Sequence, residues 1–323
     1  MQPLNILLVT PAGRGSRAGN RATADRWRRR LRELGHRVRV ATAYDGRDAD
    51  LLLAIHAFRS ADAVRAFRRE HPDRALIVLL AGTDIYRFQH SDPETTLATM
   101  DAADVLIGLH ERVADDIPAR FRDRVQVVLQ SAEPMERRPP LKRHFEICVI
   151  GHLREEKDSL RAAQAVRDLP AESRLRITQL GRAHNNEWSE AARREKETNP
   201  RFDWRGERPR GEVRRLMARA RAMVMSSRME GGANAVSEAC RAGLPVIASD
   251  IPGNIGLLGE DYPGYYPVAD TAALRACLLR AETDPDWLET LRRHCLKRAE
   301  LFTAEQERAS LARAVTAALE ARR

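Results

Sequence analysis

Apolar and polar positions alternate along the chain in two kinds of block, short apolar runs and longer amphipathic stretches. The apolar runs predict buried strands, which in the first half are Leu4–Thr10, Arg37–Ala41, Leu51–Ile55, Leu76–Leu80, Val105–Leu109 and Val125–Leu129. Between most of them lie amphipathic stretches, such as Ala22–Leu34 and Ala61–Glu70, whose apolar spacing is typical of helices. Strands that alternate with helices predict a parallel sheet covered by helices on both faces.

A polar, proline-rich segment at residues 131–144 follows these elements and predicts a linker. The pattern then restarts, with strands expected at Phe145–Ile150, Arg174–Leu180, Phe202–Trp204, Ala222–Met225 and Pro245–Ser249. Helices are expected near Lys157–Leu169, Gly211–Ala220, Ala233–Ala242 and Thr271–Ala281. The tail, residues 286–323, has a helical pattern broken at Phe302 and Thr303, and Thr303 has the side chain of a helix cap.

These patterns predict two doubly wound α/β domains and a helical tail. We expect a first Rossmann-like domain at residues 1–138, a second at residues 139–302, and a C-terminal helix at residues 303–323 that packs back toward the first domain. In such folds ligands lie beyond the carboxyl ends of the strands, so two domains facing each other across a cleft would hold a substrate between them.

The composition excludes several classes of protein. With 323 residues, of which 43% are hydrophobic and 31% charged, the chain is globular rather than fibrous or disordered. The longest apolar run, Ala75–Ala81, is far shorter than the roughly 20 residues of a membrane span. The four cysteines have no metal-binding spacing, and no signal peptide is visible, so we expect a cytoplasmic protein with reduced thiols, a monomer or weak homodimer.

The formal net charge of +9 raises the question of whether the protein binds nucleic acid. The arginines are spread over the chain, and the densest cluster, Arg26–Arg32, lies on an expected amphipathic helix, where charges usually form the solvated face. No zinc finger, RNA-recognition signature or basic zipper accompanies it. We therefore expect no nucleic acid and no membrane partner, and interpret the charge as attraction for anionic small molecules. A non-catalytic nucleic-acid binder is the alternative class.

The segment after the strand Ala222–Met225 carries the most informative chemistry. Gly231 and Gly232 precede a helix, where glycines let the backbone approach a ligand and the first N–H groups favour an anion. Glu230 lies before that helix and Glu238 within it, about two turns further on. One carboxylate can therefore bind a sugar while the other reaches a second polyol.

This Glu-x7-Glu arrangement resembles the donor site of the retaining GT-B glycosyltransferases. The resemblance implies that Glu238 holds the nucleotide ribose, that Glu230 binds a sugar hydroxyl near the reacting carbon, and that the turn Gly231-Gly232 with Asn234 cradles the diphosphate. Downstream, the segment Ala242–Ser249 resembles the Gly-x-Pro-Val strand of the same domain.

The segment Gly151–Lys157 resembles a second motif of that family, in which an arginine and a lysine grip the diphosphate. Lys157 matches the lysine, His152 stands where the arginine is expected, and Arg154 is close enough to substitute for it. Cationic groups are needed there because the leaving nucleoside diphosphate gains charge as the glycosidic bond breaks. The resemblance thus implies donor binding by Lys157, Arg154 and His152.

A narrower resemblance, to the SenB selenosugar synthases of selenoneine biosynthesis, spans nearly the whole chain. The segments that carry it are Gly19–Trp27, Leu53–Ser60, Ala81–Tyr86, Gly151–Asp158, Met229–Glu238 and Gly253–Gly259. It implies a GT-B enzyme that transfers a sugar, chiefly N-acetylglucosamine, from a UDP-sugar to selenophosphate. UDP is released and a selenosugar forms once phosphate is lost.

The first half offers residues for such an acceptor. His56, Arg59, Thr83 and Asp84 follow strands, so we expect them to form the acceptor site. An anionic selenium nucleophile needs little activation, and it calls for positive charge and hydrogen-bond donors. Asn20 and its loop would close near the diphosphate. We expect catalytic roles for Glu230, Lys157 and His56, and we expect the reaction to use neither a metal ion nor another cofactor.

Other interpretations stay open. His56 and Asp84 could serve acid–base chemistry on a sugar hydroxyl, as in a glycosyltransferase that modifies a glycan or small metabolite. Gly13 and Gly15 fit a loose dinucleotide fingerprint, but Ala41-Thr42 stands where the acidic residue is needed, so an NAD enzyme is a weak runner-up. The stereochemistry of transfer also stays open. The Glu-x7-Glu motif favours retention at the anomeric carbon, whereas attack by a soft anionic nucleophile from the opposite face would give inversion.

Overall fold

The computed structural model of the protein describes residues 2–16 and 18–322. The chain forms two compact units, the first ending at Ser131 and resuming at Thr303, the second comprising Ala132–Phe302. The sequence pattern placed this boundary at residue 138, but residues 132–138 belong to the second unit. The reason is that Arg137 and Arg138 bond to the backbone at the end of a second-unit helix, with Arg138 N 2.8 Å from Ala218 O.

The first unit contains one parallel sheet of strand order β2-β1-β3-β4-β5-β6. The strands are β1 (Asn5–Val9), β2 (Arg37–Ala41), β3 (Leu51–Ile55), β4 (Ala75–Leu79), β5 (Val105–Gly108) and β6 (Val125–Val127). The α-helices are α1 (Gly19–Glu33), α2 (Ala61–Glu70), α3 (Gln89–Ser91), α4 (Pro93–Ala102) and α12 (Ala304–Glu320). The short helices are the π-helix η1 (Asp84–Phe88) and the 3₁₀-helices η2 (Val113–Asp116) and η3 (Ala119–Arg124).

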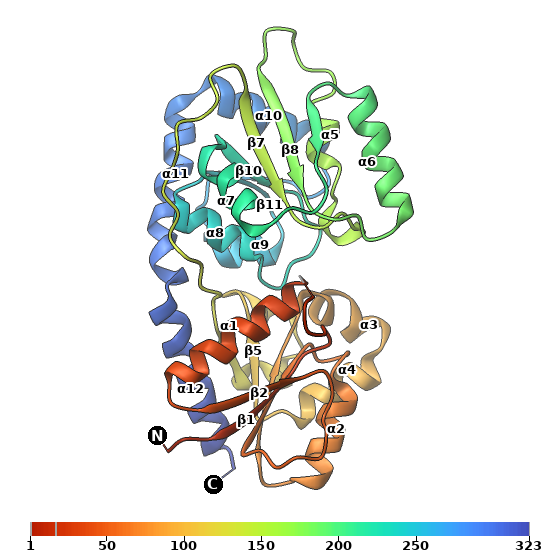
Figure 1. The fold of residues 1–323 in the computed structure, drawn as a ribbon, viewed down its shortest axis with the longest axis vertical. Helices are drawn as coiled ribbons and strands as arrows, with labels where there is room; N and C mark the ends of the chain where they lie inside the picture. The colour runs from red at the N-terminus through yellow and green to blue at the C-terminus, as the bar shows by residue number, and fades with distance from the viewer. Residues whose placement is uncertain (1, 17, 323) are drawn as a thin grey trace. The chain divides into compact units, whose positions relative to one another are not determined.

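Helices cover both faces of this sheet (Figure 1). On one face Trp27 and Leu31 of α1 and Leu311 of α12 share a core with Leu8 and Ile77 of the strands. On the other face the core is closed by α2 and α4. The inner strands β3, β4 and β5 have no polar side chain because both of their faces are buried.

The second unit repeats the plan with strand order β12-β11-β10-β7-β8-β9, again all parallel. The strands are β7 (Phe145–Ile150), β8 (Leu175–Leu180), β9 (Phe202–Trp204), β10 (Ala222–Met225), β11 (Val246–Ser249) and β12 (Tyr265–Tyr266). The α-helices are α5 (Arg161–Ala165), α6 (Asn186–Thr198), α7 (Arg210–Arg219), α8 (Asn234–Ala242), α9 (Pro252–Leu258), α10 (Thr271–Thr283) and α11 (Pro285–Ala299). The 3₁₀-helices are η4 (Glu155–Lys157) and η5 (Glu300–Phe302).

Two local predictions have different outcomes. Thr303 does cap α12, since its side chain accepts a hydrogen bond from Gln306 N at 3.2 Å. The continuous helix expected over Lys157–Leu169 is wrong, because Asp158 has a positive φ of 44°, which ends η4 before α5 begins. Among the helices of residues 2–16 and 18–322, none has both the length and the apolar character that crossing a bilayer requires.

Candidate active site

Two loops at the carboxyl edge of the second sheet carry the residues expected to bind the donor. One follows β7 and contains Lys157, and the other follows the neighbouring strand β10 and contains Glu230. The loops are bonded together: Arg228 N donates to Glu156 O at 2.8 Å, and Ser226 Oγ donates to the Lys157 carbonyl at 3.1 Å. Residues far apart in the sequence therefore form one continuous surface.

Lys157 and Glu230 meet directly on this surface. The Lys157 ammonium forms an ion pair with Glu230 Oε1, and Ser227 Oγ donates to the same oxygen at 2.6 Å. The side chains of Lys157 and Glu230 are 19% and 8% exposed, so their charges are screened less than those of surface groups. A cation and a carboxylate side by side suit a ligand that carries both a phosphate and a sugar hydroxyl.

The start of α8 lies next in the chain. Gly231 and Gly232 lead to Ala233, the N-cap, whose side chain makes no capping hydrogen bond. The first backbone N–H groups of a helix lack partners within the helix and favour an anion. Asn234 opens α8 and Glu238 follows within it, both half-buried. All of the donor residues expected from the sequence except Asn20 thus lie on two adjoining loops and the helix α8.

The loop after β7 has a neutral histidine where the family motif has an arginine. Burial is the main cause that lowers the pKa of His152, and nearby cations, including Arg182 and Lys157, lower it further while Glu207 opposes them. Its Nδ1 accepts a hydrogen bond from Arg182 N at 3.1 Å. His152 therefore offers no positive charge near neutral pH, which leaves that task to Lys157 and to the exposed Arg154.

The backbone of Glu230 is approached closely by α9. A Cβ placed on Gly253 would lie 2.2 Å from Glu230 O, a distance that requires the backbone to move. We expect Gly253→Ala to displace the loop that holds Glu230, lower stability by about 1–3 kcal/mol and weaken nucleotide-sugar binding. Calorimetric titration and thermal melts check both effects.

The matched control is Gly211→Ala in α7. Its added Cβ meets nothing closer than 3.6 Å, so we expect unchanged binding and equal or higher stability. Equal binding by the two variants would contradict the steric account of Gly253.

The first unit brings together three of the residues expected to bind the acceptor. His56 Nδ1 lies 2.7 Å from Asp84 Oδ1, and His56 Nε2 lies 3.0 Å from Thr83 Oγ1. The buried Asp84 carboxylate also accepts three backbone N–H bonds, from Ala57, Phe58 and Ala81. Asp84 therefore fixes the orientation of the His56 ring, and Nε2 of that ring lies against the hydroxyl of Thr83.

Backbone geometry at this position is unusual. His56 has a φ of +79°, which costs free energy for any residue but glycine, and Asp84 opens the π-helix η1. Strained residues and π-helical turns both occur preferentially at functional sites. The ring of Phe88, at the end of η1, stacks on Phe58 with centroids 4.2 Å apart.

A second histidine at this sheet edge was missed from the sequence. His110 follows β5 and is fully buried, and burial lowers its pKa to about 4, so it is neutral. Its Nε2 lies 3.2 Å from the hydroxyl of Tyr86, which donates to Asp116 at 2.8 Å. The rule that selected His56, a polar residue directly after a strand, could also have selected His110.

Two further residues have side chains outside these contacts. Arg59 donates only its backbone N–H to His56 Nδ1, at 3.3 Å, and is exposed, and Asn20 lies in the first turn of α1. Asn20 belongs to the first unit whereas the other donor residues belong to the second. Binding of substrate by Asn20, His56, Arg59, Thr83 and Asp84 stays a prediction.

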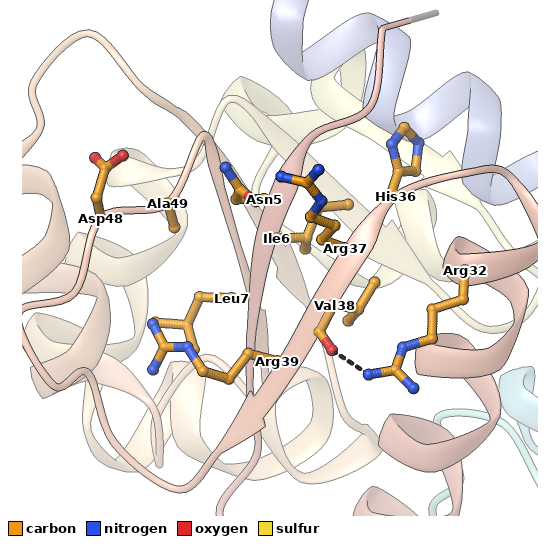
Figure 2. Close-up of a pocket in the computed structure, with 10 residues that line it drawn as sticks. All are labelled: Asn5, Ile6, Leu7, Arg32, His36, Arg37, Val38, Arg39, Asp48 and Ala49. Carbon is orange, nitrogen blue, oxygen red and sulfur yellow. Dashed lines mark hydrogen bonds between the residues drawn. The ribbon is translucent and has the colours of Figure 1, made fainter.

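A cavity of about 460 Å³ lies at the opposite edge of the first sheet (Figure 2). It is bordered by the amino ends of β1 and β2 and by Asp48 and Ala49. Two of its arginines form hydrogen bonds or ion pairs: Arg32 donates to Val38 O at 3.0 Å, and Arg39 pairs with Asp45. Since ligands of such sheets bind at the carboxyl ends, the cavity is separate from the candidate site.

A model of a known protein family matches the part of the sequence that contains these donor loops. The model of the family described as "Glycosyl transferases group 1" matches residues 133–301, just over half of the chain. The chain belongs to the group 1 glycosyltransferases. The match covers both loops of the second unit and the helix that carries Glu238. Among curated proteins, a search with the sequence gives no match.

Solved structures resemble this chain over nearly its whole length. HepE of Anabaena, in complex with UDP and glucose, has a TM-score of 0.77 at 14% identity, over 97% of this chain and 99% of its own. Sucrose-phosphate synthase of Thermosynechococcus elongatus has a TM-score of 0.74 at 15% identity, over 98% of each chain. The protein therefore has the GT-B fold of two Rossmann-like domains with a helical C-terminal end.

Proposed function

We propose that the protein transfers N-acetylglucosamine from a UDP-sugar to selenophosphate and so forms a carbon–selenium bond. The observation that carries the donor half is the contact between Lys157 and Glu230 beside the glycine turn of α8. Similar structures agree with this chemistry: HepE was solved with UDP-glucose, and the pneumococcal O-GlcNAc transferase GtfA with UDP and GlcNAc. The acceptor half rests on the resemblance to the SenB selenosugar synthases.

In this proposal the second unit stabilises the leaving group. The bond between the anomeric carbon and the diphosphate oxygen breaks, its electron pair leaves with UDP, and selenium forms the new bond. Lys157 and Arg154 neutralise the charge that develops on UDP, Glu230 binds a sugar hydroxyl, and Glu238 holds the ribose. Because a lysine supplies the cation, no metal is part of the proposal, and EDTA is expected to leave turnover unchanged.

In the first unit, the acceptor would be bound by donors and positive charge. Arg59 offers an exposed guanidinium, and Thr83 offers a hydroxyl that lies 3.0 Å from His56 Nε2 and can turn to the acceptor. A dianionic acceptor needs such groups, whereas it needs no strong base to become nucleophilic.

The decisive experiment mixes the purified protein with UDP-N-acetylglucosamine and selenophosphate. We expect mass spectrometry to detect UDP together with a selenium-containing sugar. UDP release without such a sugar would disprove the acceptor, and absence of UDP binding would disprove the donor as well.

We expect Glu238→Ala to weaken UDP binding by about 10- to 100-fold, because it removes a charge-assisted hydrogen bond to the ribose. Isothermal titration with UDP checks this. Glu197→Ala, an exposed substitution in α6, serves as the control and should bind UDP like the wild type. A Glu238→Ala protein with wild-type affinity would remove the ribose assignment.

One observation favours a second candidate, transfer to a hydroxyl of a glycan or small metabolite. The Asp84–His56 pair leaves His56 Nε2 as a proton acceptor, which a hydroxyl nucleophile needs. A panel of hydroxyl acceptors, assayed beside selenophosphate, separates the two candidates by which product appears.

A further inference from the structure

Glu230 is held from the interior of the second unit by Ser227. Ser227 is fully buried and Glu230 is 7% exposed, and the Ser227 hydroxyl donates to Glu230 Oε1 at 2.6 Å. A short hydrogen bond to a carboxylate is among the stronger kinds in proteins. The side chain of Glu230 therefore has one oxygen fixed from within.

Ser227 is itself fixed by two buried residues. Ser249, at the end of β11, donates from Oγ to the Ser227 carbonyl at 2.6 Å. Asn254, in the first turn of α9, donates from Nδ2 to Ser249 O at 3.0 Å and lies 3.1 Å from Ser249 Oγ. Ser249 and Asn254 are both fully buried. The chain Asn254–Ser249–Ser227 thus ties Glu230 to β11 and α9.

The second partner of Glu230 Oε1 is Lys157, which the proposed function assigns to the diphosphate. When Lys157 turns its N–H groups toward a phosphate, the Ser227 hydroxyl is the neutral donor that keeps Glu230 in place. Glu230 then presents its other oxygen to the sugar.

We propose that Ser227, supported by Ser249 and Asn254, is a positioning residue that sets the orientation of Glu230 toward the sugar of the donor. This rests on the proposed function of Glu230. On this proposal the reaction requires the hydroxyl group of residue 227, and a correctly folded loop that lacks this hydroxyl is not sufficient.

The test compares Ser227→Ala with Ser227→Thr, which restores a hydroxyl, and with Thr178→Val as a matched control. Thr178 also donates from a buried hydroxyl to a buried carboxylate, that of Glu146, at 3.0 Å, but within the strands β7 and β8. We measure kcat for UDP release with selenophosphate, the affinities for UDP and UDP-N-acetylglucosamine, and the melting temperature.

For Ser227→Ala we expect kcat to fall about 10- to 100-fold, UDP affinity to stay within about twofold, and the extra affinity given by the sugar to be lost. Ser227→Thr should recover most of kcat. Thr178→Val should lower the melting temperature without changing kcat. Ser249→Ala, which leaves the Ser227 hydroxyl in place, should lower kcat to a smaller extent.

The proposal would be overturned if Ser227→Ala had the kcat and the sugar affinity of the wild type. It would also be overturned if Ser227→Ala and Ser227→Thr lost kcat equally. Glu230→Gln separates this failure from that of the proposed function. If Glu230→Gln lowers kcat and Ser227→Ala does not, only the positioning role is wrong. If neither variant changes kcat or sugar affinity, or the wild type binds no UDP, the donor site itself is wrong and the positioning role falls with it.

Discussion

Replacing Lys157 by methionine is expected to lower the rate of UDP release by about 10²–10³-fold. The substitution keeps an unbranched apolar stem but removes the ammonium group that contacts Glu230 and would neutralise the leaving diphosphate. Such a group acts mostly on the transition state, so kcat should fall more than the affinity for UDP. Steady-state kinetics with UDP-N-acetylglucosamine, together with a thermal melt that verifies folding, measures both.

Arg154→Met is the matched control for the same loop. The side chain of Arg154 is 44% exposed and its nearest carboxylate contact, to Glu156, is 3.9 Å long. Solvent screening makes its charge less effective, so we expect a loss several times smaller than that of Lys157→Met. An equal or larger loss for Arg154→Met would show that the main cation had been misassigned.

The largest effect on stability is expected for Glu307→Ala, at about 3–5 kcal/mol. Glu307 lies in α12 with no exposed surface, and its carboxylate accepts from Arg26 Nε at 2.8 Å, Trp27 Nε1 at 2.9 Å and the Ser131 hydroxyl. Alanine would remove the acceptor of the half-buried Arg26 guanidinium and of the buried Trp27 indole N–H. Scanning calorimetry of the full chain should show a strongly lowered transition.

Glu305→Ala, in the first turn of the same helix, is the control. Glu305 is exposed, so only its favourable interaction with the helix dipole is lost, worth below about 1 kcal/mol. A Glu307→Ala protein that melts as Glu305→Ala does would mean that the buried carboxylate contributes no net stability.

The sheets could be predicted from the sequence because their strands are buried on both faces. Runs such as Leu51–Ile55 contain no polar position, and they coincide with observed strands. The two-residue strand Tyr265–Tyr266 was missed, since it is too short to show a pattern. The left-handed backbone conformation of Asp158 could not be predicted either, because an aspartate at this position does not require that conformation.

The donor loops could be found because the chemistry follows strands that the pattern reveals. Lys157 and Glu230 are 73 positions apart, yet both follow strands that are neighbours in one sheet. Ser227, Asn254 and Glu307 carry no comparable signal. Their roles come from long-range packing, such as the contact of Glu307 with Trp27 across 280 positions, and only the folded chain displays it.

The place of α12 has a consequence for biosynthesis. Leu311 and Val315 of this last helix complete the core on one face of the first sheet, whose strands are translated long before them (Figure 1). Until α12 leaves the ribosome, only α1 covers that apolar face, and the part that α12 will bury stays exposed on the nascent chain. Chaperone dependence during translation should therefore fall once α12 emerges.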